Sequence, residues 1–152
     1  MTSVLFVCLG NICRSPLAEG IFSARLARAG LDARIAVDSA GTGNWHAGKP
    51  PDPRSVDIAA RNGIDLRGLR ARQVRADDFQ RFDVVLAMDS DNLASLQGMQ
   101  RQSSQKPRCR LRMFLSDNVP DPYFGGPDGF RTVFEMLDAG CDTLLHELTQ
   151  GI

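Results

Sequence analysis

The chain has 152 residues, of which 43% are hydrophobic and 24% charged, and Lys and Arg together number 18, as do Asp and Glu. This length and composition predict a single globular domain over residues 1–152. Because the formal net charge is zero and no apolar run approaches the ~18 residues of a membrane span, we expect neither nucleic-acid binding nor membrane insertion.

Strand-like and helix-like patterns alternate along the chain. Short apolar runs bounded by turn residues predict strands over residues 4–7, 35–37, 84–88 and 111–115. Apolar periodicity and capping residues predict helices over residues 16–29, 53–62, 77–81, 89–99 and 130–148. Strands that alternate with helices indicate an α/β fold whose strands pair in parallel through right-handed crossovers.

The stretch VLFVCLGNICRSPLAEG, residues 4–20, joins the first predicted strand to the first predicted helix. Cys8 stands at the carboxyl end of that strand, where open parallel sheets bind their ligands. Ser15 is a favoured N-cap and Pro16 suits the first helical position, so we expect the loop to end at a helix N-terminus. A loop containing Gly10 can turn several N–H groups inward, and Arg14 offers a planar fork, so the stretch predicts a bound oxyanion such as phosphate.

A cysteine beneath such a cradle has a specific chemistry. The helix N-terminus, Arg14 and the Ser15 hydroxyl all stabilise the Cys8 thiolate, which is a nucleophile. It can attack phosphorus to form a cysteinyl-phosphate while Arg14 and the loop amides hold the other oxygens, so no metal is required. The alternative is a small buried cysteine that ends a core strand, with Arg14 in a surface ion pair.

The same stretch, together with DSAGTGNWHAG, PDPRS, FDVVLAMD and VPDPYFGG, resembles the low-molecular-weight protein tyrosine phosphatases over essentially the whole chain. The resemblance implies an open four-stranded parallel sheet flanked by helices, in the flavodoxin-like order 2-1-3-4, with the phosphate loop after the first strand. It also implies a cytoplasmic protein-tyrosine phosphatase that needs no cofactor and acts on phosphotyrosine-containing proteins. We expect a monomer; a partner tyrosine kinase and non-classical export stay open.

The resemblance assigns roles to individual residues. Cys8 is the nucleophile, Arg14 clamps the transition state, and Asp121 protonates the leaving phenolate and then activates water. The other assigned positions are the phosphate-binding loop (Leu9, Gly10, Asn11, Ile12, Cys13 and Ser15), the loop support Ser39, and the substrate pocket (Trp45, Tyr123 and Phe124). Cys13 is also the expected redox partner, forming a disulfide with Cys8 on oxidation.

Several of these positions have plainer alternatives. Asp121 could be a turn residue before proline, as Asp52 before Pro53 is, where we expect a helix N-cap. The polar loop residues could serve only as local turn and cap groups. Tyr123 lies on the acid loop, which makes it a candidate for phosphorylation.

Other residues are interpreted as structural. The arginine-rich stretch 67–75 predicts a solvated surface element, and His46 a loop surface residue. We expect Cys109 and Cys141 in the core. Leu69 stands where many members of the family have a histidine, which puts the rigidity of the phosphate loop in question.

Three rival functions are weaker. A thioredoxin-coupled arsenate reductase shares the loop, but it needs further cysteines after the third strand, where AMDSDNLASLQGM has none. A non-catalytic phosphotyrosine-binding module would keep the cradle without turnover. The glycines of GTGNWHAG do not have the spacing of a dinucleotide-binding motif.

Overall fold

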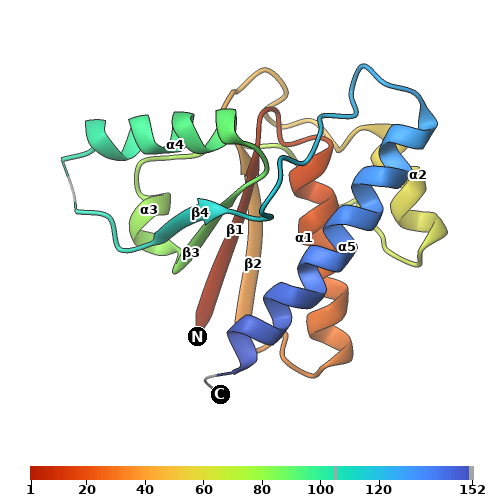
Figure 1. Ribbon diagram of the computed structural model, residues 1–152, viewed down its shortest axis with the longest axis horizontal. Helices are drawn as coiled ribbons and strands as arrows, with labels where there is room; N and C mark the ends of the chain where they lie inside the picture. The colour runs from red at the N-terminus through yellow and green to blue at the C-terminus, as the bar shows by residue number, and fades with distance from the viewer. Residues whose placement is uncertain (105, 151–152) are drawn as a thin grey trace.

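Four parallel strands form one sheet in the computed structural model, which describes residues 1–104 and 106–150 (Figure 1). The order across the sheet is β2-β1-β3-β4, as expected. The strands are β1 (Thr2–Cys8), β2 (Ile35–Gly41), β3 (Val84–Ala87) and β4 (Arg110–Met113). The helices are α1 (Arg14–Arg28), α2 (Pro53–Arg61), α3 (Asp78–Arg81), α4 (Ser90–Gln102) and α5 (Pro127–Thr149).

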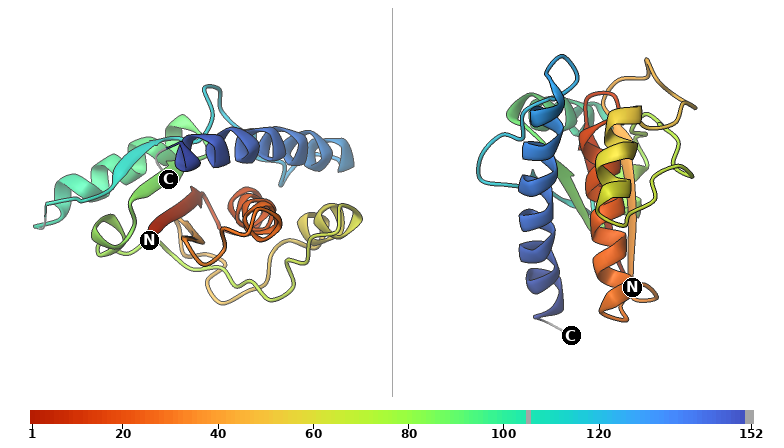
Figure 2. Two further views of the ribbon diagram at one scale, coloured as in Figure 1. Left: turned by 90° about the horizontal axis from the view of Figure 1, so that it is seen from below. Right: turned by 90° about the vertical axis from the view of Figure 1, so that its right-hand side faces the viewer.

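Helices cover both faces of the sheet, which explains why the buried parts of its central strands, residues 4–8 and 84–87, are apolar. Val4 and Phe6 point into a core shared with α1 and α5, which lie side by side (Figures 1 and 2). Leu5 and Val7 point to the opposite face, where they join the second core with Phe79 of α3. None of the helices among the described residues has the length and apolar character needed to cross a membrane.

The strand order creates the place for a site. From β1 the chain crosses to β2 on one side, whereas β3 lies on the other side of β1. The carboxyl ends of β1 and β3 therefore flank a topological switch point, where open α/β sheets bind ligands. Cys8 is the last residue of β1, and Asp89 follows β3 by two residues, so both lie at this edge.

Two expectations about local structure turn out wrong. The N-cap of α1 is Cys13 rather than Ser15, and no side chain caps the helix. Ser15 is fully buried and its hydroxyl contacts the Cys8 sulfur, so a tertiary contact replaces the expected cap. Arg72, from the stretch expected to be solvated, is only 23% exposed, and it forms ion pairs with Asp38 and Asp78, each at 3.0 Å.

The expected cap of α2 and the core position of Cys141 are confirmed, whereas the core position expected for Cys109 is not. The Asp52 side chain caps α2 by accepting the Arg54 backbone N–H at 2.8 Å. Cys141 is fully buried between α5 and α1, whereas Cys109 is only partly buried at the margin of the second core.

Candidate active site

Several carbonyl groups of the segment from Cys8 to α1 are bound by neighbouring parts of the chain. Three of them accept backbone N–H groups, and among the described residues no N–H of residues 9–13 donates to another protein group. The three bonds run from Thr42 N to Cys8 O at 2.9 Å, from Gly43 N to Leu9 O at 2.9 Å, and from Asp52 N to Ile12 O at 2.8 Å. Because the carbonyls are engaged outside, the loop amides are left to bind an anion.

Two positions allow this tight loop. Asn11 has a φ of 58°, in the left-handed region that asparagine tolerates better than most residues. Gly41 at the end of β2 lies directly against the loop. A Cβ there would be 2.8 Å from the Leu9 carbonyl oxygen and 3.0 Å from the Gly10 carbonyl carbon. A larger residue at position 41 would therefore displace the loop.

The Cys8 thiol lies beneath this loop and is almost fully buried. Its sulfur is 3.0 Å from the Ser15 hydroxyl oxygen, and α1 begins at Arg14 just behind it. A hydroxyl donor and a helix N-terminus both stabilise negative charge on sulfur.

Arg14 joins three parts of the site. Its guanidinium is 2% exposed and donates to Asp89 at 2.6 Å and to the Val119 carbonyl at 3.0 Å, while its other terminal nitrogen is 3.7 Å from Asp121. Burial by itself lowers the pKa of Arg14, but the neighbouring charges of Cys8, Asp89 and Asp121 outweigh it and raise that pKa. Arg14 is therefore a fixed cation beside the loop.

Asp121 lies on the loop between β4 and α5, where it makes a turn contact and also faces Arg14. One carboxyl oxygen accepts the Tyr123 backbone N–H at 3.1 Å, which is a turn contact. The other oxygen faces Arg14, and the side chain stays 38% exposed. The turn thus orients a carboxyl group that solvent and a ligand can both reach.

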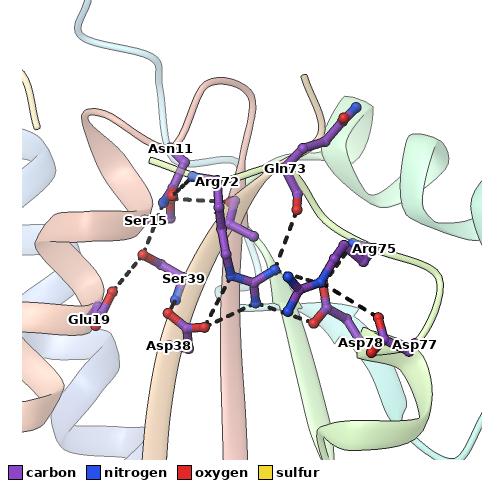
Figure 3. Close-up of polar contacts among 11 residues, drawn as sticks. Asn11, Ser15, Glu19, Asp38, Ser39, Arg72, Gln73, Arg75, Asp77 and Asp78 are labelled. Atoms are coloured by element: carbon purple, nitrogen blue, oxygen red, sulfur yellow. Dashed lines mark hydrogen bonds and ion pairs between the residues drawn. The ribbon is translucent and has the colours of Figure 1, made fainter. Parts of the chain in front are cut away.

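A buried polar network supports the loop from behind (Figure 3). The Asn11 amide nitrogen donates to the Ser15 hydroxyl at 2.8 Å and to the Ser39 hydroxyl at 2.9 Å. The Asn11 amide oxygen accepts the Arg72 backbone N–H at 3.0 Å. Ser39 in turn donates to Glu19 of α1 at 2.6 Å.

Two groups near the loop are more easily protonated than usual. Burial raises the pKa of Glu19 to about 7, opposed by the hydrogen bond from Ser39. Burial, assisted by the charges of Asp52 and Cys8, raises the pKa of the Cys13 thiol to about 12, so Cys13 is a neutral thiol at physiological pH.

Aromatic side chains gather near the loop between β4 and α5 that carries Asp121. The Tyr123 and Phe124 rings contact edge to face at a centroid separation of 4.8 Å, and Phe124 is 94% exposed. The His46 ring lies 6.4 Å from that of Tyr123 and next to Gly10, and His46 stays partly exposed on its loop. Trp45 packs on Gly43 of its own loop and is 66% exposed.

A family model described as low molecular weight phosphotyrosine protein phosphatase matches residues 3–151. The chain belongs to this family. The protein-tyrosine phosphatase YfkJ of Bacillus subtilis is 45% identical over 97% of this chain and 96% of its own. The family member from Schizosaccharomyces pombe is 47% identical over 88% of each chain. The crystal structure of DARP, a Drosophila arginine phosphatase, superimposes with a TM-score of 0.93, 32% identity and 99% coverage of both chains.

In this phosphatase the fold brings the three residues expected to be catalytic to one edge of the sheet, and it adds residues that sequence reasoning missed. Asp89 holds Arg14, yet the sequence suggested only a helix start there. Its position just after β3 was a usable signal, because side chains at that edge converge. Glu19 and Arg72 gave no such signal, since their partners lie far away in the chain. Within the described residues, no group of three or more His, Cys, Asp or Glu side chains is arranged to hold a metal ion.

Proposed function

We propose that this phosphatase hydrolyses aryl phosphate monoesters, with phosphotyrosine in proteins as the natural class, through a cysteinyl-phosphate on Cys8 and without a metal. The observation that carries the proposal is the position of the Cys8 sulfur: 3.0 Å from the Ser15 hydroxyl, beneath unpaired loop amides and beside the buried Arg14. A phosphoryl dianion fits this arrangement because its oxygens meet N–H donors while phosphorus faces the sulfur.

In the first half-reaction the Cys8 thiolate attacks phosphorus, the S–P bond forms and the bond to the phenolic oxygen breaks. Asp121 delivers its proton to that oxygen, so the product leaves as a neutral phenol. Arg14 and the loop amides hold the three remaining oxygens, on which charge is spread in the transition state.

In the second half-reaction Asp121, now ionised, takes a proton from water as the water attacks phosphorus. The S–P bond breaks, phosphate leaves, and the electron pair returns to sulfur as a thiolate. The Ser15 hydroxyl donates a hydrogen bond to this departing thiolate. The partial exposure of Asp121 suits it to this step, because the attacking water comes from solvent.

The aromatic residues near the acid loop support an aryl substrate. Tyr123, Phe124 and Trp45 present flat apolar surface at exposed positions, which suits stacking on a phenyl ring. The similarity to DARP makes phosphoarginine a second candidate substrate, in which the bond that breaks is P–N. Relative kcat/KM for a phosphotyrosyl and a phosphoarginyl peptide of otherwise identical sequence decides between them.

The proposed setting follows from the substrate class. We place the protein in the cytoplasm as a monomer that meets phosphotyrosine proteins and a partner tyrosine kinase. Tyr123 is the only tyrosine of the chain and is 37% exposed, so the kinase has an accessible target on the acid loop. Mass spectrometry of protein isolated from kinase-active cells should find phosphate on Tyr123; unmodified Tyr123 would contradict the kinase partner.

The test of the function is turnover of p-nitrophenyl phosphate in EDTA by the wild type and by the Cys8→Ser variant. We expect activity in the wild type, none in Cys8→Ser, and retained binding of inorganic phosphate by the variant. Phosphate binding without wild-type turnover would instead indicate the non-catalytic binding module. Turnover that Cys8→Ser retains would contradict the mechanism.

A further inference from the structure

A continuous line of hydrogen bonds connects Glu19 on α1 to the Cys8 sulfur (Figure 3 shows all but its last bond). Its members in order are Glu19, Ser39, Asn11, Ser15 and Cys8, separated by 2.6, 2.9, 2.8 and 3.0 Å. All members except Glu19 are buried, so water does not compete for the hydrogen bonds between them.

The chemistry of the groups sets the direction of the bonds that Asn11 makes. The Arg72 backbone N–H donates to the Asn11 amide oxygen, so the Asn11 NH2 group must face the two serines. Each serine oxygen therefore accepts a hydrogen bond from Asn11, and its own O–H is free to donate elsewhere. The Ser39 hydroxyl donates to Glu19. The Ser15 hydroxyl has two acceptors within reach, the Cys8 sulfur at 3.0 Å and the Ala40 carbonyl at 3.4 Å, of which the sulfur is the nearer.

Arg72 keeps this arrangement in place because its side chain is itself anchored. The guanidinium lies between Asp38 and Asp78, with contacts of 3.0 Å to each, and Asp78 is fully buried (Figure 3). The backbone N–H that orients Asn11 is thus attached to a residue that cannot easily turn away.

Glu19 is the ionisable member at the far end of the line, and among the described residues no cation forms an ion pair with it. Leu69 lines the same cavity of about 320 Å³ and brings an apolar side chain to it. The charged groups that face Glu19 are Asp38 from β2, which disfavours its ionised form, and Arg72, which favours it; Asp65 also lines the cavity. Burial raises the pKa of Glu19 to about 7, so its charge changes near physiological pH.

We propose that Glu19 is a positioning residue for the nucleophile: its carboxylate accepts the hydrogen bond of the Ser39 hydroxyl, which keeps the Ser39 oxygen turned toward the Asn11 NH2 group and so steadies the side chain that also donates to Ser15 beside the Cys8 sulfur. A protonated Glu19 accepts only through a neutral carbonyl oxygen or donates to Ser39 instead. Ser39 then holds Asn11 less firmly, and Ser15 is less well oriented toward sulfur. The inference rests on the proposed function, because it concerns the thiolate of that reaction.

The test compares wild type with Glu19→Gln, whose side chain resembles the protonated acid in shape and charge. We expect the ratio of the wild-type kcat to the variant kcat for p-nitrophenyl phosphate to be near one at pH 5. The ratio should rise through a midpoint near pH 7 to about three- to tenfold at pH 8. This is the rate factor expected when one hydrogen bond is lost from the transition state. The ratio cancels every pH effect that the two enzymes share, including the titration of the substrate.

Two further variants separate positioning from a structural effect. Glu147→Gln removes a carboxylate of α5 that pairs with Arg112 at 2.8 Å, and we expect its kcat ratio to stay flat with pH. In a Ser39→Ala background the line is already cut, so adding Glu19→Gln should cost nothing more.

Each outcome bears on a distinct claim. A Glu19→Gln ratio that is flat across pH, or a full additional loss in the Ser39→Ala background, would overturn the role of Glu19. Wild-type turnover that depends on Cys8 would leave the proposed function standing in either case. Absence of that turnover would refute the proposed function, and the role of Glu19 with it.

Discussion

Replacing Asp89 tests how Arg14 is held in place. Arg14 is 2% exposed, and Asp89 is its closest anionic partner at 2.6 Å. The same carboxylate also caps α4, accepting the Asn92 N–H at 2.7 Å. Asn and Ala therefore separate the two roles, because asparagine is a good N-cap without charge whereas alanine provides neither.

The magnitudes follow from burial. Removing one partner of a fully buried ion pair costs about 3–5 kcal/mol, but Asp89 is 21% exposed and Arg14 keeps the Val119 carbonyl, so we expect about 2 kcal/mol for Asp89→Asn. Asp89→Ala also loses the cap and should lose about 1 kcal/mol more of the free energy of unfolding. Both variants should lose about 100-fold in kcat/KM, because the Arg14 guanidinium is no longer held in the orientation that hydrogen-bonds the phosphoryl oxygens.

The assay is urea unfolding of the three proteins together with kcat/KM for p-nitrophenyl phosphate. Wild-type stability in Asp89→Asn would show that the ion pair does not hold Arg14, and an Asp89→Ala protein as stable as Asp89→Asn would refute the capping role. Unchanged kcat/KM in both would mean that Arg14 reaches its working position without Asp89.

Four other variants test separate parts of the site. Asp121→Asn should slow the hydrolysis of phosphate esters of weakly acidic phenols much more than the hydrolysis of p-nitrophenyl phosphate, since a good leaving group needs no proton. Equal slowing of both would contradict the role of Asp121 as the acid. Gly41→Ala should lose about 1–3 kcal/mol of unfolding free energy and most activity, because the new Cβ would lie 2.8 Å from the Leu9 carbonyl oxygen; wild-type behaviour would show that the loop yields. Burial raises the pKa of Glu19 from 4.5 to about 7, so its ionisation costs stability as pH rises through that window. In urea unfolding, the free energy of unfolding of Glu19→Gln relative to wild type should therefore increase by about 1–3 kcal/mol from pH 5 to pH 8. A difference that stays constant over this range would contradict the raised pKa of Glu19. Cys13→Ser should prevent thiol reductants from restoring activity after peroxide treatment, because the Cys8 sulfenic acid cannot condense with the Cys13 thiol to a disulfide and water; full recovery would rule out that disulfide.

The parts of the site that the sequence predicted are local or recur as motifs. Cys8 ends an apolar run and Arg14 follows within one loop, so their proximity is a property of the segment itself. Asp121 and the strand order came from the resemblance to a family, since nothing in the periodicity of single segments places residue 121 beside residue 14.

What the sequence did not predict depends on contacts between distant segments. Ser15 has the chemistry of an N-cap, but its hydroxyl serves Cys8 and Asn11, and this tertiary arrangement outweighs the local preference. Arg72 is one of several arginines in a polar stretch, and only the folded chain distinguishes it by burying it between two carboxylates. Glu19 lies on a helix that the sequence predicted, but its hydrogen-bond partner Ser39 lies on β2.

The central claim is a covalent phosphate on Cys8, and the most direct measurement is rapid acid quench during turnover of p-nitrophenyl phosphate in EDTA, followed by intact-mass analysis and peptide mapping. The account predicts a phosphate adduct on the peptide that contains Cys8, enriched in Asp121→Asn if that variant slows hydrolysis of the intermediate. Turnover with no phosphate on Cys8 at any quench time, or with the phosphate on another residue, would contradict it.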